Sequence, residues 1–161
     1  MKPVRKFMEV AIAQSLIGMR RGEGGPFGAV IVQGEKVIAR GYNRVLDTLD
    51  PTAHAEIVVI REACLKQKTF QLDGCDLYTS CEPCPMCLAA AYWARVDRIF
   101  FANTRKDAES VGFGDNFIYQ ELGRTVSKRN LPLIPFLRKE GGLAFKEWRD
   151  KPNKTSYGPT L

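Results

Sequence analysis

The stretch CDLYTSCEPCPMCLAAAYWAR, residues 75–95, decides the fold because it passes from a strand pattern to a helix pattern. The segment CDLYTS predicts a short strand. The segment PMCLAAAYWAR is apolar almost throughout and has helical length, which predicts a buried helix. That helix begins with Pro85, and proline is favoured in the first turn because no N–H has to be satisfied there. DRIFFAN, residues 97–103, then predicts another strand.

The sequence before this stretch predicts two helices with a hairpin between them. Apolar residues recur at helical spacing over residues 4–19, which predicts an N-terminal helix with one buried stripe. Residues 29–43, AVIVQGEKVIARGYN, predict a hairpin that turns at Gly34 and Glu35. Residues 54–67, HAEIVVIREACLKQ, have helical length, and their apolar side chains surround most of the axis. This second helix should therefore be buried.

The sequence after the stretch predicts a last strand and a closing helix. Residues 131–137, LPLIPFL, predict a fifth strand at a sheet edge, where Pro132 and Pro135 are tolerated. Residues 142–150, GLAFKEWRD, predict a helix. Strands that alternate with helices in this order predict an α/β fold, with a mixed five-stranded sheet flanked by helices.

Length and charge limit the classes of protein to consider. The chain of 161 residues predicts one domain, residues 1–161, with a tail at residues 150–161. The net charge is +6, and residues 121–161 hold nine Lys and Arg against four Asp and Glu. These charges are scattered, which favours a solvated surface over a nucleic-acid site. The apolar stretches are too short for a membrane span, and no cleavage site follows the N-terminal helix, so we expect a cytoplasmic protein.

Three cysteines spaced three apart present a choice between a redox motif and a metal site. Cys81, Cys84 and Cys87 form two overlapping C-x-x-C pairs, and His54 is the single histidine of the chain. A redox motif needs only one pair at a helix start and leaves His54 without a role. A structural zinc site with all four residues as ligands is the serious alternative. We interpret the two remaining cysteines, Cys64 and Cys75, as small buried side chains.

The proline favours a three-ligand zinc site. Pro85 places Cys84 and Cys87 at positions i and i+3 of the first helical turn, on one face. Thiolates are stabilised at that end of a helix, whereas Cys81 lies upstream where the chain leaves a strand. We therefore expect one zinc per chain, held by His54, Cys84 and Cys87. Three protein ligands leave a fourth position for water, which is typical of catalytic zinc.

Glu56 follows His54 by two residues and supplies the group that such a site needs. A carboxylate that is not a ligand but lies beside an activated water acts first as general base and then as general acid. A carboxylate at the start of a helix also has an ordinary explanation, since it interacts favourably with the helix dipole. The metal site beside it favours the catalytic interpretation, and we expect Glu56 to carry protons during the reaction.

The H-x-E … P-C-x-x-C arrangement is the known signature of the zinc nucleobase deaminases. The chain resembles the cytidine/deoxycytidylate deaminase superfamily over nearly its whole length, and within it the small bacterial-type guanine deaminases. The resemblance lies in GGPFGAVIV, DPTAHAE, CEPCPMCLAAAYWAR, GFGDNFIY, and a tyrosine nine residues after the tryptophan of the C-terminal W-R. It implies a three-layer α/β/α cytidine-deaminase-like fold. It also implies hydrolysis of guanine to xanthine and ammonia, with water attacking C2.

The same resemblance implies roles for residues that the pattern alone would not single out. Phe27 would lie against the purine face, and Asn43 would offer its amide to the purine edge. Asp115 would hold the amino group or assist proton transfer. Tyr157 of the partner subunit would close the pocket in a homodimer that exchanges its C-terminal tails. Taken without the resemblance, the first three are better explained as a core phenylalanine, a turn asparagine and a loop aspartate.

Other functions stay open at this point. The tRNA wobble-adenosine deaminases share DPTAHAE and EPCPMC with this chain. They have a stretch similar to VPVGA where this chain has GPFGA, and they lack GFGDNFIY. The resemblance therefore favours a small purine base over nucleic acid. A cytosine or nucleoside deaminase of the same superfamily fits the metal site equally well. A zinc module without catalytic activity is the alternative of a different class.

Overall fold

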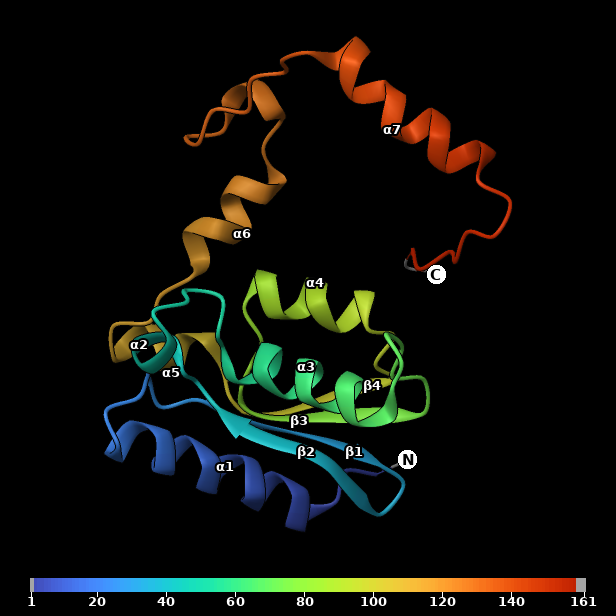
Figure 1. The fold of residues 1–161 in the computed structure, drawn as a ribbon. Helices are drawn as coiled ribbons and strands as arrows, with labels where there is room; N and C mark the ends of the chain where they lie inside the picture. Colours follow the sequence, from blue (N-terminus) through green and yellow to red (C-terminus); the bar gives the residue numbers. More distant parts are fainter. Residues whose placement is uncertain (1, 159–161) are drawn as a thin grey trace. The chain divides into compact units, whose positions relative to one another are not determined.

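The computed structural model describes residues 2–158, which form two compact units, residues 2–115 and residues 116–158. The first unit contains a four-stranded sheet with the strand order β2-β1-β3-β4 (Figure 1). Strand β1 pairs antiparallel with β2 and with β3, whereas β3 pairs parallel with β4. The sheet is therefore mixed. Its strands are β1 (Gly28–Gln33), β2 (Lys36–Tyr42), β3 (Cys75–Cys81) and β4 (Arg98–Asn103).

Helices cover both faces of this sheet. Helix α1 (Arg5–Arg20) packs on one face, and α3 (Ala55–Gln67) and α4 (Pro85–Trp93) pack on the other (Figure 1). The stripe of α1 that contains Phe7 and Ala11 contributes to one hydrophobic cluster. A second and larger cluster fills the space between the sheet and the two helices α3 and α4. The predicted arrangement of a sheet between layers of helices is confirmed.

Two connections explain how the strands reach their places. The hairpin turns where predicted, between β1 and β2, and Gly34 has a φ of 58° there, a conformation that glycine adopts without a Cβ clash. Strand β3 is joined to its parallel neighbour β4 by a crossover that contains α4. The short helices α2 (Val45–Thr48) and α5 (Arg105–Ser110) were not predicted.

The second unit corrects one prediction. It contains α6 (Asn116–Gly123), a 3₁₀ turn and α7 (Arg138–Asp150), and α7 includes the predicted closing helix. Residues 131–137 form no strand, so the described sheet has four strands and not five. The physical reason is that Pro132 and Pro135 have no N–H to donate, and the unit offers no strand with which this segment can pair.

The second unit also lacks a core of its own. None of the residues 116–158 is buried, although helices α6 and α7 both carry large apolar side chains. The predicted tail begins at the last residue of α7, and its residues 159–161 lie outside the described part of the chain. No helix within residues 2–158 has the length and apolar character needed to cross a membrane.

Candidate active site

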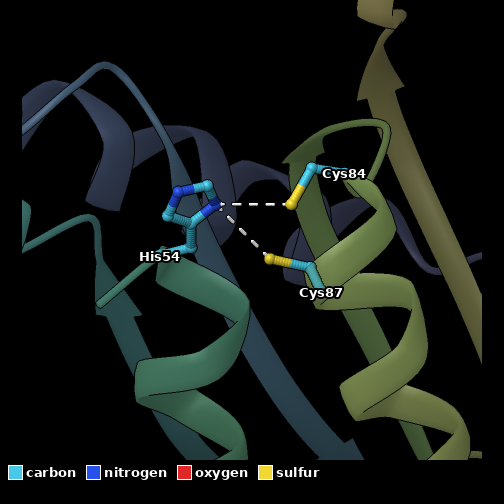
Figure 2. A group of neighbouring side chains, drawn as sticks. All are labelled: His54, Cys84 and Cys87. Carbon is cyan, nitrogen blue, oxygen red and sulfur yellow. Dashed lines mark hydrogen bonds between the residues drawn. The ribbon is translucent and has the colours of Figure 1, made fainter. Parts of the chain in front are cut away.

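The predicted metal ligands lie together at the N-terminal ends of two helices. His54 is the N-cap residue of α3, Cys84 is the N-cap residue of α4, and Cys87 lies in the first turn of α4. Figure 2 shows the imidazole of His54 directed toward both sulfur atoms. His Nδ1 and the two Sγ atoms all lie within 4.8 Å of one another. Pro85 occupies the first position of α4 and so fixes where the helix starts.

The spacing of these atoms fits a tetrahedral zinc ion. Nδ1 of His54 is 3.5 Å from Sγ of Cys84 and 3.5 Å from Sγ of Cys87. Zinc bonds of about 2.3 Å to sulfur and about 2.1 Å to nitrogen, at a tetrahedral angle, place those atoms about 3.6 Å apart. One ring nitrogen has a single proton or lone pair and cannot bond well to two sulfur atoms at once. A shared cation satisfies all three atoms.

The electrostatics of the group favour one thiolate and one thiol when no cation is bound. The pKa of the Cys84 thiol is lowered to about 4, first by the hydrogen bond from Cys87 and also by His54. The pKa of Cys87 is raised because this thiol is the hydrogen donor of the pair. The hydrogen bond with Cys84 raises the pKa of His54. Without a cation the two cysteines therefore share one proton, and a divalent cation would displace it.

Cys81 lies outside this group. Its thiol donates a hydrogen bond of 3.5 Å to the carbonyl oxygen of Thr104 at the end of β4. Burial raises the pKa of Cys81 to about 11, and its sulfur is not among the ligand atoms that lie together. Cys75 is fully buried and Cys64 is half-buried, and all five cysteines are free.

Glu56 lies in the first turn of α3 with its carboxyl group against the metal ligands. Its side chain is buried, and burial raises its pKa. One carboxyl oxygen, Oε2, lies 3.5 Å from Sγ of Cys87. The other, Oε1, accepts a hydrogen bond of 3.0 Å from the hydroxyl of Thr79 on β3. The carboxyl group therefore lies beside the metal group and is not one of its ligands.

A cavity of about 580 Å³ opens beside these residues within the first unit. Phe27, Asn43 and Asp115 line it together with His54 and Glu56. Three residues from separate loops thus meet the metal group at one cavity. Burial raises the pKa of the Asp115 carboxyl group, and the neighbouring Cys84 thiolate adds to this effect.

The amide of Asn43 has a fixed orientation in this cavity. Its Oδ1 accepts hydrogen bonds from the backbone N–H groups of Gly25, at 3.3 Å, and Val45, at 3.2 Å. A carbonyl oxygen is the only end of the amide that can accept from both donors. Gly24 permits this close approach, because a Cβ at that position would lie 2.3 Å from Oδ1. The NH₂ end of Asn43 is thereby left as a hydrogen-bond donor for a ligand.

Sequence reasoning missed two residues of the site. Phe113 lines the cavity and packs edge-to-face on Phe27, with ring centroids 5.0 Å apart. It belongs to the GFGD segment, in which only the aspartate had been assigned a role. Thr79 donates a hydrogen bond to Glu56. The one hint in the sequence is a hydroxyl residue on the same face of β3 as Leu77, which belongs to the hydrophobic core. Neither residue stands out until its neighbours across the fold are known.

Tyr157 belongs to the second unit. Its ring packs edge-to-face on Trp148 of α7, with centroids 6.3 Å apart, and more than half of its surface is exposed. Trp148 and Tyr157, which are nine residues apart in the sequence, are therefore in contact within the C-terminal segment.

The ligand set leads to a prediction on metal content. We expect the purified wild-type protein and the Cys81→Ser variant to contain one zinc per chain, because the Cys81 thiol takes no part in the ligand group. Cys87→Ser should lose most of the metal, because a serine hydroxyl stays protonated at neutral pH and is a poor zinc ligand. Elemental analysis of the three proteins measures this. Loss of zinc from Cys81→Ser with retention in Cys87→Ser would show that the other C-x-x-C pair binds the metal.

Residues 1–103 of the chain match the cytidine and deoxycytidylate deaminase zinc-binding region. The chain is 46% identical over 151 residues to a guanine deaminase of Bacillus subtilis (strain 168), a match that covers 94% of this chain and 97% of that protein. A tRNA-specific adenosine deaminase of Agrobacterium fabrum (strain C58 / ATCC 33970) is 42% identical, over 71% of this chain and 74% of that protein.

A solved structure agrees with these relatives. The X-ray structure of guanine deaminase from Bacillus subtilis superposes with a TM-score of 0.93 at 44% identity, covering 98% of this chain and 100% of the other. The arrangement of His54, Cys84 and Cys87 is thus found in a chain that matches zinc-binding deaminases in sequence and in fold. We conclude that the chain belongs to the cytidine and deoxycytidylate deaminase family of zinc-binding enzymes.

Proposed function

We propose that this chain is a zinc-dependent aminohydrolase that converts guanine and water to xanthine and ammonia. The observation that carries the proposal is the match to a guanine deaminase over 94% of the chain, second unit included. The site supports it independently, because a buried proton carrier, a metal group and a cavity for a planar base meet in one place.

The chemistry divides between the metal and the residues of the chain. A zinc ion held by His54, Cys84 and Cys87 supplies Lewis-acid activation that lowers the pKa of a water to about 7. Glu56 takes a proton from the attacking water and delivers it to N3 of the base. It then takes the remaining proton from the hydroxyl group now bonded to C2 and gives it to the amino group, which leaves as ammonia. Asp115 lines the same cavity and holds that amino group or assists the transfer. The oxygen of water replaces the amine, so the atoms balance.

Recognition of the base follows from the orientation of Asn43. This side chain offers only donors to the cavity, because its oxygen is occupied by Gly25 and Val45. An N–H donor suits the O6 carbonyl of guanine, which is a hydrogen-bond acceptor. Phe27 offers an apolar surface for the face of the purine, and Phe113 supports it.

The two relatives also bear on the alternative functions. The tRNA-specific adenosine deaminase that resembles this chain covers 71% of it, against 94% for the guanine deaminase. Cytosine and cytidine remain as candidates that the metal group alone does not distinguish, and they belong in the same experiment.

The partner that we propose for this chain is a second copy of itself. The second unit buries no side chain, yet it exposes a series of large apolar residues, among them Phe117, Leu131, Leu133, Ile134, Phe136, Leu143, Phe145 and Trp148. So much exposed apolar surface indicates an interaction site. We infer a cytoplasmic homodimer in which residues 1–161 of each chain act as one deaminase domain. In that dimer, Tyr157 of the partner subunit covers the cavity.

A substrate panel tests the proposed function. We expect ammonia release to be fastest with guanine when the zinc-loaded protein is given guanine, guanosine, cytosine, cytidine, adenosine or an adenosine-bearing tRNA stem-loop. Preference for the stem-loop would replace the proposal with the tRNA function, and preference for cytosine or cytidine with the pyrimidine function.

A further inference from the structure

Thr79 lies in the middle of the sheet, where its position is fixed from both sides. Its strand, β3, pairs with β1 through Ala29 and with β4 through Phe101. Side chains alternate along a strand, so Thr79 faces the same side as Leu77 and Cys75, toward α3 and α4. Tyr78 faces the opposite side, toward α1. Thr79 therefore presents a hydroxyl group from a rigid element into an otherwise apolar layer.

A hydroxyl at such a place requires a partner. Thr79 is 0% exposed, and valine would fill the same volume on this face without a polar atom to satisfy. The partner is Glu56, whose Oε1 accepts the hydroxyl hydrogen at 3.0 Å. The two residues are 23 positions apart in sequence, so this bond joins the central strand to the first turn of α3.

The hydrogen bond from Thr79 restricts the rotation of the Glu56 carboxyl group. The last torsion of a glutamate side chain is broad, so the carboxyl group rotates unless other groups hold it. Thr79 holds one oxygen, and the other, Oε2, lies 3.5 Å from Sγ of Cys87 in the metal group. The two oxygens are thus made unequal, one directed to the sheet and one to the metal site.

We propose that Thr79 is a positioning residue for the deamination, which holds Oε1 of Glu56 so that Oε2 is the oxygen that takes and delivers protons. This inference rests on the proposed function in that Glu56 must be the proton carrier. It adds that the orientation of Glu56 is set from β3 and not from α3 alone. A carboxyl group that must meet first a water and then two nitrogen atoms gains from being held in one orientation.

Two substitutions separate positioning from packing. Thr79→Val keeps the volume and removes the hydroxyl, whereas Thr79→Ser keeps the hydroxyl and removes a methyl group. We expect Thr79→Val to lower kcat by about 10- to 100-fold, with KM changed by about twofold or less. Thr79→Ser should retain kcat within about threefold. Both proteins should bind one zinc per chain, because the ligand atoms are untouched. Crystal structures of the zinc-loaded variants should show the Glu56 carboxyl group rotated only in Thr79→Val.

Ser80 provides a matched control. It is a buried hydroxyl residue on the same strand, its side chain faces the other side of the sheet, and its Oγ accepts a hydrogen bond from the N–H of Gly28. Ser80→Ala should lower the melting temperature yet leave kcat near the wild-type value. It therefore measures what the loss of a buried hydrogen bond does by itself.

The outcomes are distinguishable from those of the substrate panel. Kinetics are measured with whichever base the wild-type protein deaminates fastest, so failure of guanine alone refutes the proposed substrate and leaves this test intact. Near-normal kcat in Thr79→Val, or an unmoved Glu56 in its crystal structure, would overturn the positioning role. So would an equal loss in Thr79→Ser, which would indicate packing. A protein that deaminates no base would overturn both proposals.

Discussion

Replacing Glu56 by glutamine is expected to abolish deamination while leaving zinc and fold in place. Glutamine has the same size, and its amide oxygen still accepts the hydrogen bond from Thr79. It cannot accept a proton, however, and one general acid–base step is worth roughly 10²- to 10⁴-fold in rate. Because Glu56 is proposed to serve in several proton transfers, we expect a loss beyond that range. Ammonia release and elemental analysis on the same preparation measure activity and metal content together.

Glu82 is the matched control for this substitution. It is another of the carboxylates that line the cavity, and its Oε2 accepts a hydrogen bond from the backbone N–H of Arg105. Glu82→Gln removes the same charge from the same cavity but no proposed proton carrier, so its turnover should stay within about 10-fold of the wild type. Near-normal turnover in Glu56→Gln would exclude the proposed role. A wild-type protein with zinc and no activity would indicate a non-catalytic zinc module.

Deleting residues 150–161 is expected to leave a folded, zinc-loaded first unit with a large loss of turnover. The deletion removes Tyr157 and its contact with Trp148, but no residue of the metal group or of the cavity. Exclusion of water strengthens electrostatic interactions at the reacting centre. Loss of a group that closes the site should therefore cost on the order of 10²-fold in kcat, comparable to loss of one stabilising donor. Steady-state kinetics and zinc analysis of the truncated protein test this.

Mixing two inactive chains shows which subunit supplies the tail. The truncated chain has an intact Glu56, and a full-length Glu56→Gln chain has an intact tail. In a dimer with exchanged tails, the heterodimer brings both to one site, and activity should return after subunit exchange. A tail that acts within its own chain would restore nothing. As a control, the truncated chain is mixed with a chain that carries both changes, and this mixture should stay inactive under either arrangement.

The features that the sequence predicted correctly are those set by neighbouring residues. The first helix follows from apolar residues repeating at helical spacing, and it occurs at Arg5–Arg20. The turn at Gly34 follows from a residue that adopts positive φ without strain. The start of α4 follows from Pro85, which also fixes the spacing of Cys84 and Cys87 on one helical turn. Local backbone chemistry decides each of these.

The fifth strand was predicted wrongly because a strand is not a local structure. The short apolar run in LPLIPFL is compatible with a strand, but a strand is stable only when another strand accepts and donates its hydrogen bonds. Residues 131–137 have no such neighbour in the second unit, and Pro132 and Pro135 remove two of the donors that pairing would use. The apolar composition of this segment therefore predicted a strand, but composition does not supply the neighbouring strand that pairing needs.

The sequence by itself determined which residue types carry the chemistry, because H-x-E and P-C-x-x-C are short motifs placed at helix starts. Only the tertiary structure decided how their atoms face one another. It brought His54 next to two sulfur atoms about 30 positions away in the sequence. It also bound the amide oxygen of Asn43, which leaves the NH₂ group as a donor, and it placed Thr79 against Glu56. These contacts cross between separate strands, helices and loops. Their geometry depends on how the layers pack, which no local pattern encodes.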